Sequence, residues 1–379
     1  MNQASNSAVM SVAVIGAGMA GLSAASRFQK AGCDVTVFEK ARGSGGRLSS
    51  KRLVIAQTGA ADIEAGFDLG CTHFDVQSDF AGAAQFQVLL DQYQAAGCVS
   101  HWPTSAGRRT SYVGLNRNSA LTRAMTEGLN VQFATRVSQL KKVGERWQVL
   151  DEAHQALANV DHVVLAVPVQ QALDLLGSVA LPSTATDRTE IDALVARLTQ
   201  AYIAPQWVMG VVLDAQAKAL LASAALPASV VLEGNGVLAQ LTLEHTKPQR
   251  GPQAVMQIQA QTAWSEQHTD TPKAEVEQQL LAALQDWLAQ AHPQLGINLS
   301  DHVLAVHVHR WLYANSSATP LNQLVGRVYG STASGLHVCG DYWLAETKQQ
   351  GVQAAFASGW ALAQALVETW VESSARQQA

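Results

Sequence analysis

Three glycines near the amino terminus, in the run Gly16-Ala-Gly18-Met-Ala-Gly21, constrain the fold more than any other feature of the sequence. An apolar stretch from Ser11 to Ile15 precedes them, and a helix-like stretch from Leu22 to Lys30 follows. A strand that turns through glycines into a helix brings free backbone amides to the positive end of that helix, where they bind a pyrophosphate. The first glycine permits the tight turn, the second lets the backbone approach the phosphates, and the third lets the helix pack closely on the sheet.

A second strand-like run, Asp34 to Phe38, ends at Glu39. Strand, helix and second strand then have the βαβ order of a dinucleotide-binding unit, in which a carboxylate at this place binds the hydroxyls of the adenosine ribose. The same carboxylate would repel a 2′-phosphate, which argues against NADP. A lone glycine motif is a weak sign, but here strand, helix, second strand and acid all agree.

The next segment, KARGSGGRLSSKR from Lys40 to Arg52, favours a flavin over a nicotinamide cofactor. A simple nicotinamide-dependent dehydrogenase does not need this loop. Its glycine doublet, Gly45-Gly46, and Arg47 offer further amides and a cation to the diphosphate of an extended FAD. The alternative is a solvated basic loop, which the position directly after the ribose acid disfavours.

Composition excludes several classes of protein. Lys and Arg are scattered and the net charge is −5, so nucleic acid is not an expected partner. No apolar run reaches the length of a membrane span, and the first ten residues lack the features of a signal peptide, so we expect a soluble protein without a membrane partner. The four cysteines form no CxxC pair, which favours a reducing cytoplasm.

The carboxyl end carries a second glycine-rich pattern. Gly335 to Asp341 reads as a strand ending in Gly340-Asp341, and residues 350–360 begin a long helix. This end, with the runs VIGAGMAGLSAA, FEKARGSGGRL and GFDLG, resembles the flavin-containing amine oxidase superfamily, and more closely its renalase-like branch. The resemblance implies that Asp341 binds a ribityl hydroxyl and that amides at Gly351 and Val352 face the N1–C2 edge of FAD. A helix N-terminus there stabilises the negative charge of reduced flavin.

Further site residues follow from the same resemblance. It implies that Arg42 and Arg47 flank the FAD phosphates, that Asp68 to Gly70 lie beside the isoalloxazine, and that Val137 lends backbone groups to the adenine. Cys339 lacks the motif of covalently linked amine oxidases, so the FAD is expected to be non-covalent. The predicted cofactor residues are Gly16, Gly18, Met19, Ala20, Gly21, Glu39, Lys40, Arg42, Gly45, Gly46, Arg47, Leu48, Val137, Gly340, Asp341, Gly351 and Val352.

The middle of the chain supplies the candidate substrate pocket. Strand-like runs at 206–213, 230–232, 237–241 and 257–268, with a helix-like run at 274–291, predict an antiparallel sheet with a helix. The runs 243–250, 257–268 and 309–314 also resemble the renalase-like branch, whereas Thr72 and His73 depart from its usual Gln and Tyr. The pocket candidates are His73, His245, Lys247, Arg310, Trp311 and Tyr313.

Two kinds of chemistry are expected of these candidates. Arg310 suits a phosphate or carboxylate, and Trp311 and Tyr313 suit stacking on a flat ring; ordinary cross-strand packing is the alternative. Lys247 is placed either near the flavin or, as a turn lysine, in solvent. His307 and His309 share a strand face, but no third ligand cluster accompanies them in the sequence, so no metal site is predicted.

We therefore predict an α/β fold: a Rossmann-like FAD-binding domain with a glutathione-reductase-type sheet (8–74, 129–175 and 326–379) and an inserted substrate domain with an antiparallel sheet and helix (75–128 and 176–325). The expected function is that of an FAD-dependent oxidase, which transfers a hydride from substrate to flavin N5 and passes the electrons to O2 to give H2O2. The resemblance implies dihydronicotinamide isomers, oxidised to NAD(P)+, as substrate. Oxidation of an amine to an imine and a non-catalytic flavin-sensing protein are the alternatives.

Overall fold

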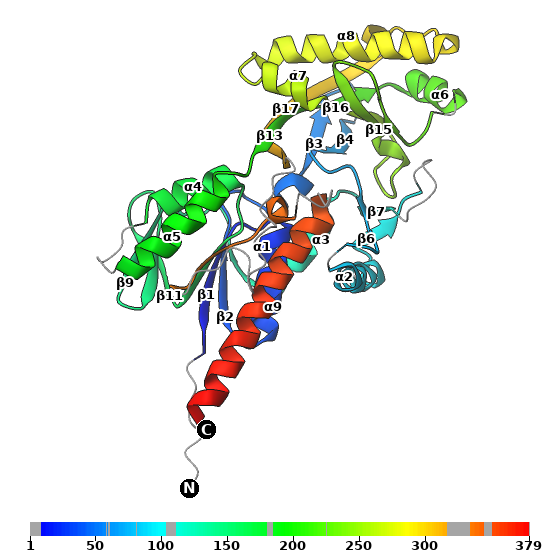
Figure 1. Cartoon of the computed structure of the whole chain (residues 1–379). Helices are drawn as coiled ribbons and strands as arrows, with labels where there is room; N and C mark the ends of the chain where they lie inside the picture. The colour runs from blue at the N-terminus through cyan, green and yellow to red at the C-terminus, as the bar shows by residue number, and fades with distance from the viewer. Residues whose placement is uncertain are drawn as a thin grey trace.

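The computed structural model describes residues 9–57, 59, 61–80, 82–103, 111–179, 185–224, 226–316, 334–344 and 351–378. Two large sheets organise these residues, one parallel and one antiparallel. Figure 1 shows the antiparallel sheet above the parallel one, with α8 (Lys273–Ala291) across the top and α9 (Gly351–Gln378) running beside β1 and β2.

The parallel sheet has the strand order β18-β12-β1-β2-β8. Its strands are β1 (Ser11–Ile15), β2 (Asp34–Phe38), β8 (Asn130–Gln132), β12 (His162–Leu165) and β18 (Leu336–Val338). Every residue of the central β1 is buried, as expected for a parallel strand that is covered on both faces. The predicted βαβ unit is present, with α1 (Met19–Lys30) as its helix.

One face of this sheet is covered by α1, against which α9 packs closely. A Cβ on Gly359 would lie 1.9 Å from the carbonyl oxygen of Ala20, so only glycine allows this approach. Helices α2 (Ala83–Ala95) and α3 (Ser119–Met125), which the sequence assigned to the substrate domain, contribute side chains to the same core as α1 and β1.

The other face of the parallel sheet is covered by a three-stranded antiparallel sheet and two helices. These are β9 (Gln139–Val143), β10 (Arg146–Leu150), β11 (Ala156–Val160), α4 (Val169–Gly177) and α5 (Ala185–Leu198). Fully buried Trp147 lies in their core beside Val163 and Leu165 of β12.

The antiparallel sheet has the order β14-β15-β16-β13-β17. Its strands are β13 (Ile203–Leu213), β14 (Ser229–Val231), β15 (Leu238–Leu243), β16 (Ala254–Ala260) and β17 (Val303–Ser316). The apolar side chains of one face, such as Met256 and Ile258, form a core with α8 and with α6 (Ala215–Ser223). The opposite face includes the glutamines of β16, because strand residues alternate between faces.

The expectation of one strand from Gln257 to His268 is wrong beyond Ala260. The chain leaves β16 and forms the helix α7 (Thr262–Gln267). The Oγ atom of Ser265 accepts a hydrogen bond from the backbone amide of Trp207 at 3.1 Å, which holds α7 against β13. The alternating pattern gave no sign of this contact, because the partner lies 58 residues away in the sequence.

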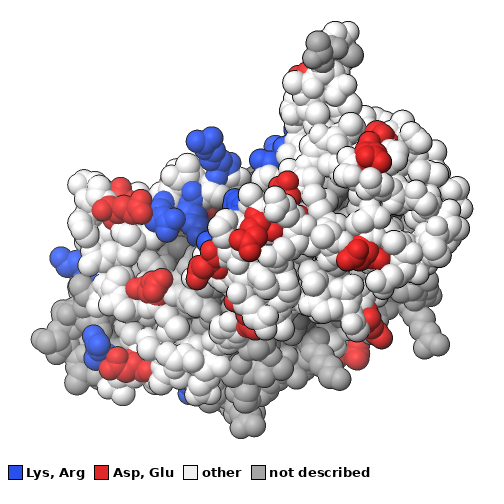
Figure 2. All heavy atoms as spheres, turned by 90° about the horizontal axis from the view of Figure 1, so that it is seen from above, with Lys and Arg blue, Asp and Glu red and all other residues white. Residues whose placement is uncertain are grey.

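Two small sheets complete the fold: the β3–β4 hairpin (Ser50–Ile55 and Ile63–Asp68) and the set β5 (Phe74–Asp75), β7 (Ser111–Gly114) and β6 (Val99–His101). The hairpin packs on the antiparallel sheet where Gly210 leaves room for the ring of Phe67. On the face seen in Figure 2, acidic and basic side chains are interspersed among residues of other kinds. No helix within the described ranges has the length and apolar character needed to cross a membrane.

Candidate cofactor and substrate site

A cavity of about 940 Å³ lies between the carboxyl ends of the parallel strands and the antiparallel sheet. Ile15, Phe38 and Gly340 border it at the ends of β1, β2 and β18, and Gln206 and Gln259 border it from β13 and β16. Open parallel sheets bind ligands outside the carboxyl ends of their strands, at the switch point where the strand order reverses.

Most of the predicted cofactor residues line this cavity. They are Gly16, Gly18, Met19, Ala20, Glu39, Lys40, Gly45, Gly46, Arg47, Leu48, Val137, Gly340, Asp341, Gly351 and Val352. Gly21 does not, because it packs against the first turn: a Cβ there would lie 2.0 Å from the carbonyl oxygen of Gly16. Arg42 is exposed and is also absent from the lining.

The glycines of the first turn differ in what surrounds them. Gly16 has a φ of +109°, and a Cβ there would lie 2.5 Å from the carbonyl oxygen of Ala166, so only glycine fits. A Cβ on Gly18 would meet no atom within 4 Å. The open space at Gly18 lies at the start of α1, where the helix dipole and free amides favour a phosphate.

Glu39 is held at the end of β2 by two backbone amides. Its carboxylate accepts hydrogen bonds from the amides of Ala17 at 2.9 Å and Ala41 at 2.8 Å. Each carboxylate oxygen has capacity for a second hydrogen bond. Glu39 can therefore brace the glycine turn and still accept from a ribose hydroxyl.

Arg47 and Asp341 form an ion pair beside the cavity, with guanidinium-to-carboxylate distances of 2.5 and 2.9 Å. Arg47 also donates to the carbonyl oxygen of Ala314 at 2.7 Å. Burial opposes the charge of Arg47, but Asp341 outweighs it, so the pKa of Arg47 is raised. The pair fixes both residues at the point where β18 ends.

The antiparallel sheet supplies the other end of the cavity. Trp311 lines it and donates its indole N–H to the carbonyl oxygen of Leu69 at 2.6 Å. His309 packs edge-on against Trp311, with ring centroids 4.6 Å apart. Tyr313 follows on the same strand and also lines the cavity. Aromatic rings thus occupy every second position of β17 from His309 to Tyr313.

Arg310 borders the cavity, but its guanidinium is engaged elsewhere. It donates to the carbonyl oxygen of Thr269, lies 3.5 Å from the Asp270 carboxylate and stacks over the ring of Trp207 at 5.8 Å. The expected role with a phosphate or carboxylate therefore finds no support in the position of this side chain. The alternation of strand residues accounts for the difference, since Arg310 lies between Trp311 and His309.

Lys247 belongs to a buried ionic cluster, defined here as Asp68, Glu244, Lys247 and Arg250. The Lys247 ammonium lies 2.8 Å from Asp68 and 2.5 Å from Glu244, and Arg250 binds both oxygens of Asp68. Burial alone would raise the pKa of Asp68, but Lys247 and Arg250 lower it to about 2. Lys247 is neither a solvated turn residue nor part of the cavity lining.

The two remaining pocket candidates also lie outside the cavity lining. The His73 ring is hydrogen-bonded to the hydroxyl of Thr72 at 2.9 Å, and burial lowers the pKa of His73. His245 contacts the backbone of Val255. Thr72 itself does line the cavity.

Sequence reasoning missed the glutamines Gln206, Gln240 and Gln259, all of which line the cavity. The available signal was their repeated occurrence in strands that are otherwise apolar. Within the described part of the chain, no group of three His, Cys, Asp or Glu side chains is arranged to hold a metal ion.

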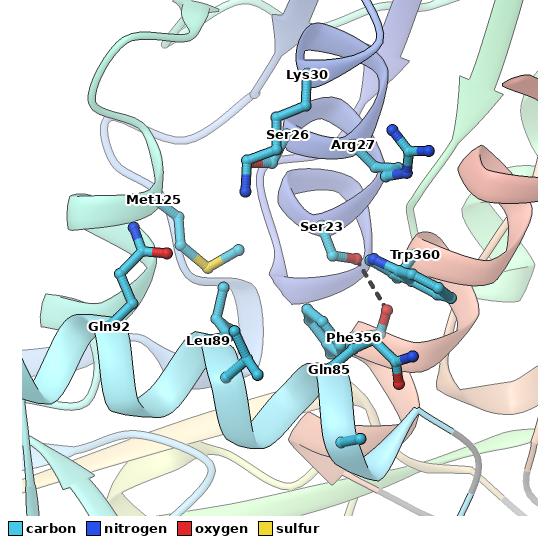
Figure 3. Close-up of a pocket in the computed structure, with 12 residues that line it drawn as sticks. Ser23, Ser26, Arg27, Lys30, Gln85, Leu89, Gln92, Met125, Phe356 and Trp360 are labelled. Carbon is cyan, nitrogen blue, oxygen red and sulfur yellow. Dashed lines mark hydrogen bonds between the residues drawn. The ribbon is translucent and has the colours of Figure 1, made fainter.

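A second cavity, of about 290 Å³, lies among α1, α2, α3 and α9. Figure 3 shows Arg27 and Lys30 of α1, Leu89 of α2 and Trp360 of α9 around it. It shares no lining residue with the larger cavity and contains none of the glycine turns. The predicted cofactor residues therefore point to the larger cavity alone.

Comparison with known proteins agrees with this arrangement. Residues 14–86 match the family described as NAD(P)-binding Rossmann-like domain. The tRNA 5-methylaminomethyl-2-thiouridine biosynthesis bifunctional protein MnmC of Thiobacillus denitrificans is 31% identical over 193 residues, a match that covers 41% of this chain and 31% of that protein. The chain thus spans less than a third of that relative.

Two solved structures resemble nearly the whole chain. A putative protoporphyrinogen oxidase from Exiguobacterium sp. 255-15 has a TM-score of 0.65 at 13% identity, with 96% of this chain and 99% of that chain covered. Putrescine oxidase bound to putrescine has a TM-score of 0.64 at 14% identity, with 95% and 99% covered. The chain therefore shares its α/β fold, with a Rossmann-like domain, with these two structures, which confirms the predicted fold class.

Proposed function

We propose that the protein is an oxidoreductase with non-covalent FAD, which when bound accepts a hydride from a substrate carbon at N5 and passes the electrons to O2, giving H2O2. The observation that carries the proposal is the continuous cavity of about 940 Å³. One end is formed by the glycine turns and Glu39, and the other by the glutamines and aromatic rings of the antiparallel sheet.

FAD fits this cavity better than a nicotinamide dinucleotide does. The first glycine turn and Glu39 would suffice for an adenosine diphosphate, but the lining continues through Gly45 and Arg47 to Asp341 and Val352. These positions would hold the second phosphate, the ribityl chain and the pyrimidine edge of an extended flavin. Gly351, at the start of α9, would stabilise negative charge there.

Two thiols beside the cavity, those of Cys71 and Cys339, favour non-covalent binding of FAD. Burial raises the pKa of Cys339 to about 12, and burial together with Asp68 raises that of Cys71 to about 12. Both are therefore protonated at neutral pH, and a thiol is a poor nucleophile compared with a thiolate.

We place the protein in the cytoplasm, in line with cysteines that are all free.

For the substrate, we propose a dihydronicotinamide isomer that is oxidised to NAD(P)+. Trp311 and Tyr313 offer flat surfaces for its ring, and the glutamines offer hydrogen bonds for its carboxamide. Hydride transfer depends mainly on orientation, which these groups would provide. Oxidation of an amine is a second candidate, because the fold is shared with putrescine oxidase bound to putrescine.

Anaerobic stopped-flow absorbance tests the proposal. The purified protein is mixed separately with 2- and 6-dihydronicotinamide dinucleotides and with a panel of amines, and the flavin band near 450 nm is followed. Rapid bleaching by the dihydronicotinamides alone is the expected result. Bleaching by an amine would favour the second candidate, whereas bound flavin that no compound reduces would indicate a non-catalytic role. A protein that takes up no FAD would overturn the proposal.

A further inference from the structure

Three glutamines cross the antiparallel sheet on the face that lines the cavity. Gln240 on β15 is the register partner of Gln259 on β16. Gln206 on β13 is the register partner of Trp311 on β17. The three amides and the indole ring therefore lie in two adjacent rows of four neighbouring strands, because Gln259 is the register partner of Val208 and not of Gln206.

The amide nitrogen of each glutamine already donates a hydrogen bond. Gln206 donates to the carbonyl oxygen of Ala260 at 3.1 Å, and Gln259 donates to that of Gly70 at 2.6 Å. Gln240 donates to the hydroxyl of Ser229 at 2.8 Å. A carbonyl oxygen only accepts hydrogen bonds, so the nitrogen of Gln206 and of Gln259 must face it.

The amide oxygens remain available to a ligand. Among the residues that the structure describes, no donor pairs with Oε1 of Gln206, Gln240 or Gln259. Polar groups that are removed from water normally find partners. A ligand that fills this end of the cavity must therefore bring N–H or O–H donors to two fixed acceptors, on Gln206 and Gln259, and can meet a third at Gln240, where the Ser229 hydroxyl suits either orientation of the amide.

This end of the cavity also lacks negative charge. The lining residues from β13, β15, β16 and β17 include no Asp or Glu. Burial, with a contribution from His307, lowers the pKa of His309 to about 4, so His309 is neutral at pH 7. The Arg310 guanidinium is held by Thr269 and Asp270. A cationic ligand would lose its hydration here without gaining a counter-charge.

We propose that Gln206, Gln240 and Gln259 determine specificity by selecting an uncharged planar molecule with N–H donors, namely an aromatic or dihydroaromatic primary carboxamide. This inference rests on the proposed function, because it assigns the rest of the cavity to the cofactor. Trp311 and Tyr313 supply apolar surface for the ring, and the carboxamide NH2 group supplies the donors.

Benzamide, acetophenone and benzylamine test the inference with the purified holoprotein. Benzamide and acetophenone differ in NH2 against CH3, and benzylamine is cationic at pH 7. Binding is measured by ligand-observed NMR titration, and bound flavin is measured separately by absorbance. Benzamide should bind about 5- to 30-fold more tightly than acetophenone, the effect of one or two hydrogen bonds, and more tightly than benzylamine.

Gln240 is the best position for variants, because Ser229 can rotate its hydroxyl to suit a new partner. Gln240→Met should reduce the preference for benzamide about fivefold, and Gln240→Glu should increase the affinity for benzylamine. Gln261→Met is the matched control: its amide donates to the carbonyl oxygen of Leu238 at 3.1 Å, and it does not line the cavity. This variant should keep the wild-type preference.

The inference and the proposed function fail in different ways. Equal binding of benzamide and acetophenone, or a preference that Gln240→Met leaves unchanged, would overturn the inference whether or not flavin is present. Absence of bound flavin would overturn the proposed function, while the NMR titration still reports the selectivity of the glutamines.

Discussion

At the scale of single residues, Gly18 offers the cleanest test of the cofactor site. Its φ of −83° and ψ of −179° are open to alanine, and a Cβ there meets no atom within 4 Å. Gly18→Ala should therefore fold normally but place a methyl group where a phosphate would approach the backbone. We expect FAD affinity to fall roughly 10- to 100-fold, the equivalent of about 1.4–2.8 kcal/mol, as measured by fluorescence titration of the apoprotein.

Gly177→Ala is the control for this substitution. A Cβ at Gly177 also meets no atom within 4 Å, and Gly177 does not line the cavity. FAD affinity should be unchanged in this variant. Unchanged affinity in Gly18→Ala as well would mean that the phosphates do not approach this turn.

His162 gives a prediction about pH. Its ring lies 3.0 Å from that of buried His337, and burial, with a smaller effect of Lys142, lowers its pKa from 6.5 to about 4 despite the nearby Asp161. The unfolded chain therefore binds this proton near pH 6.5, whereas the folded chain binds it only near pH 4. Between these pH values the unfolded chain binds a proton that the folded chain does not. The free energy of unfolding is therefore unaffected by His162 above pH 6.5 and decreases as the pH falls from 6.5 towards 4.

Urea denaturation at pH 7, 6 and 5 measures this loss, which for one histidine is at most about 1.4 kcal/mol per pH unit. His162→Gln should make the pH dependence less steep over this range, and the remaining slope belongs to other histidines with lowered pKa values, such as His309 and His337. An equally steep dependence in the variant would assign the lost stability to other groups.

The residue scale also shows what the sequence could reveal. Gly16 was predictable because the local strand-to-helix turn sets its positive φ, and Glu39 because it binds the nearby amides of Ala17 and Ala41. The engagement of Arg310 by Thr269 was not, because it depends on α7 folding back over β13. Gln240 and Gln259 were overlooked because glutamine carries no motif of its own.

At the scale of elements, the contact between α1 and α9 joins the two ends of the chain. The glycines at the start of each helix allowed both helices to be predicted from the sequence. The short distance between the two helices could not be predicted. A Cβ on Gly359 would lie 1.9 Å from the carbonyl oxygen of Ala20 and 2.5 Å from Ser23 Oγ. Helical periodicity is a local property, whereas this contact is set by residues more than 300 positions apart.

Gly359→Ala should therefore force the two helices apart. We expect a loss of about 1–3 kcal/mol in the free energy of unfolding, typical of overpacking. FAD retention should also fall, because the start of α9 supplies Gly351 and Val352 to the cavity. Thermal and urea denaturation test the first effect, and the flavin-to-protein absorbance ratio tests the second. Val371→Ala, at a position 65% exposed on the same helix, should change neither.

At the scale of the whole molecule, the buried ionic cluster fastens the antiparallel sheet to the β3–β4 hairpin. Asp68 ends β4, whereas Glu244, Lys247 and Arg250 follow β15. The sequence places Asp68 and Lys247 179 positions apart, so no local pattern could pair them. The next residues after Asp68, including Gly70 and Thr72, line the cavity. The cluster therefore connects the stability of the assembly to the shape of the site.

Lys247→Met should be strongly destabilising for this reason. It leaves Asp68 and Glu244 buried with Arg250 as their one cation within the cluster, and breaking a buried ion pair typically costs about 3–5 kcal/mol. His245→Ala, in the same turn but outside the cluster, should cost much less. Urea denaturation measures both variants, and absorbance measures their bound flavin.

A second substitution separates charge balance from packing in this cluster. Burial already raises the pKa of Glu244, so it is the carboxylate most easily neutralised. Adding Glu244→Gln to Lys247→Met leaves one carboxylate, Asp68, paired through both oxygens with Arg250. The double variant should therefore recover part of the lost stability and flavin. If it is instead less stable than Lys247→Met alone, packing and hydrogen bonds rather than charge balance hold the hairpin and the antiparallel sheet together.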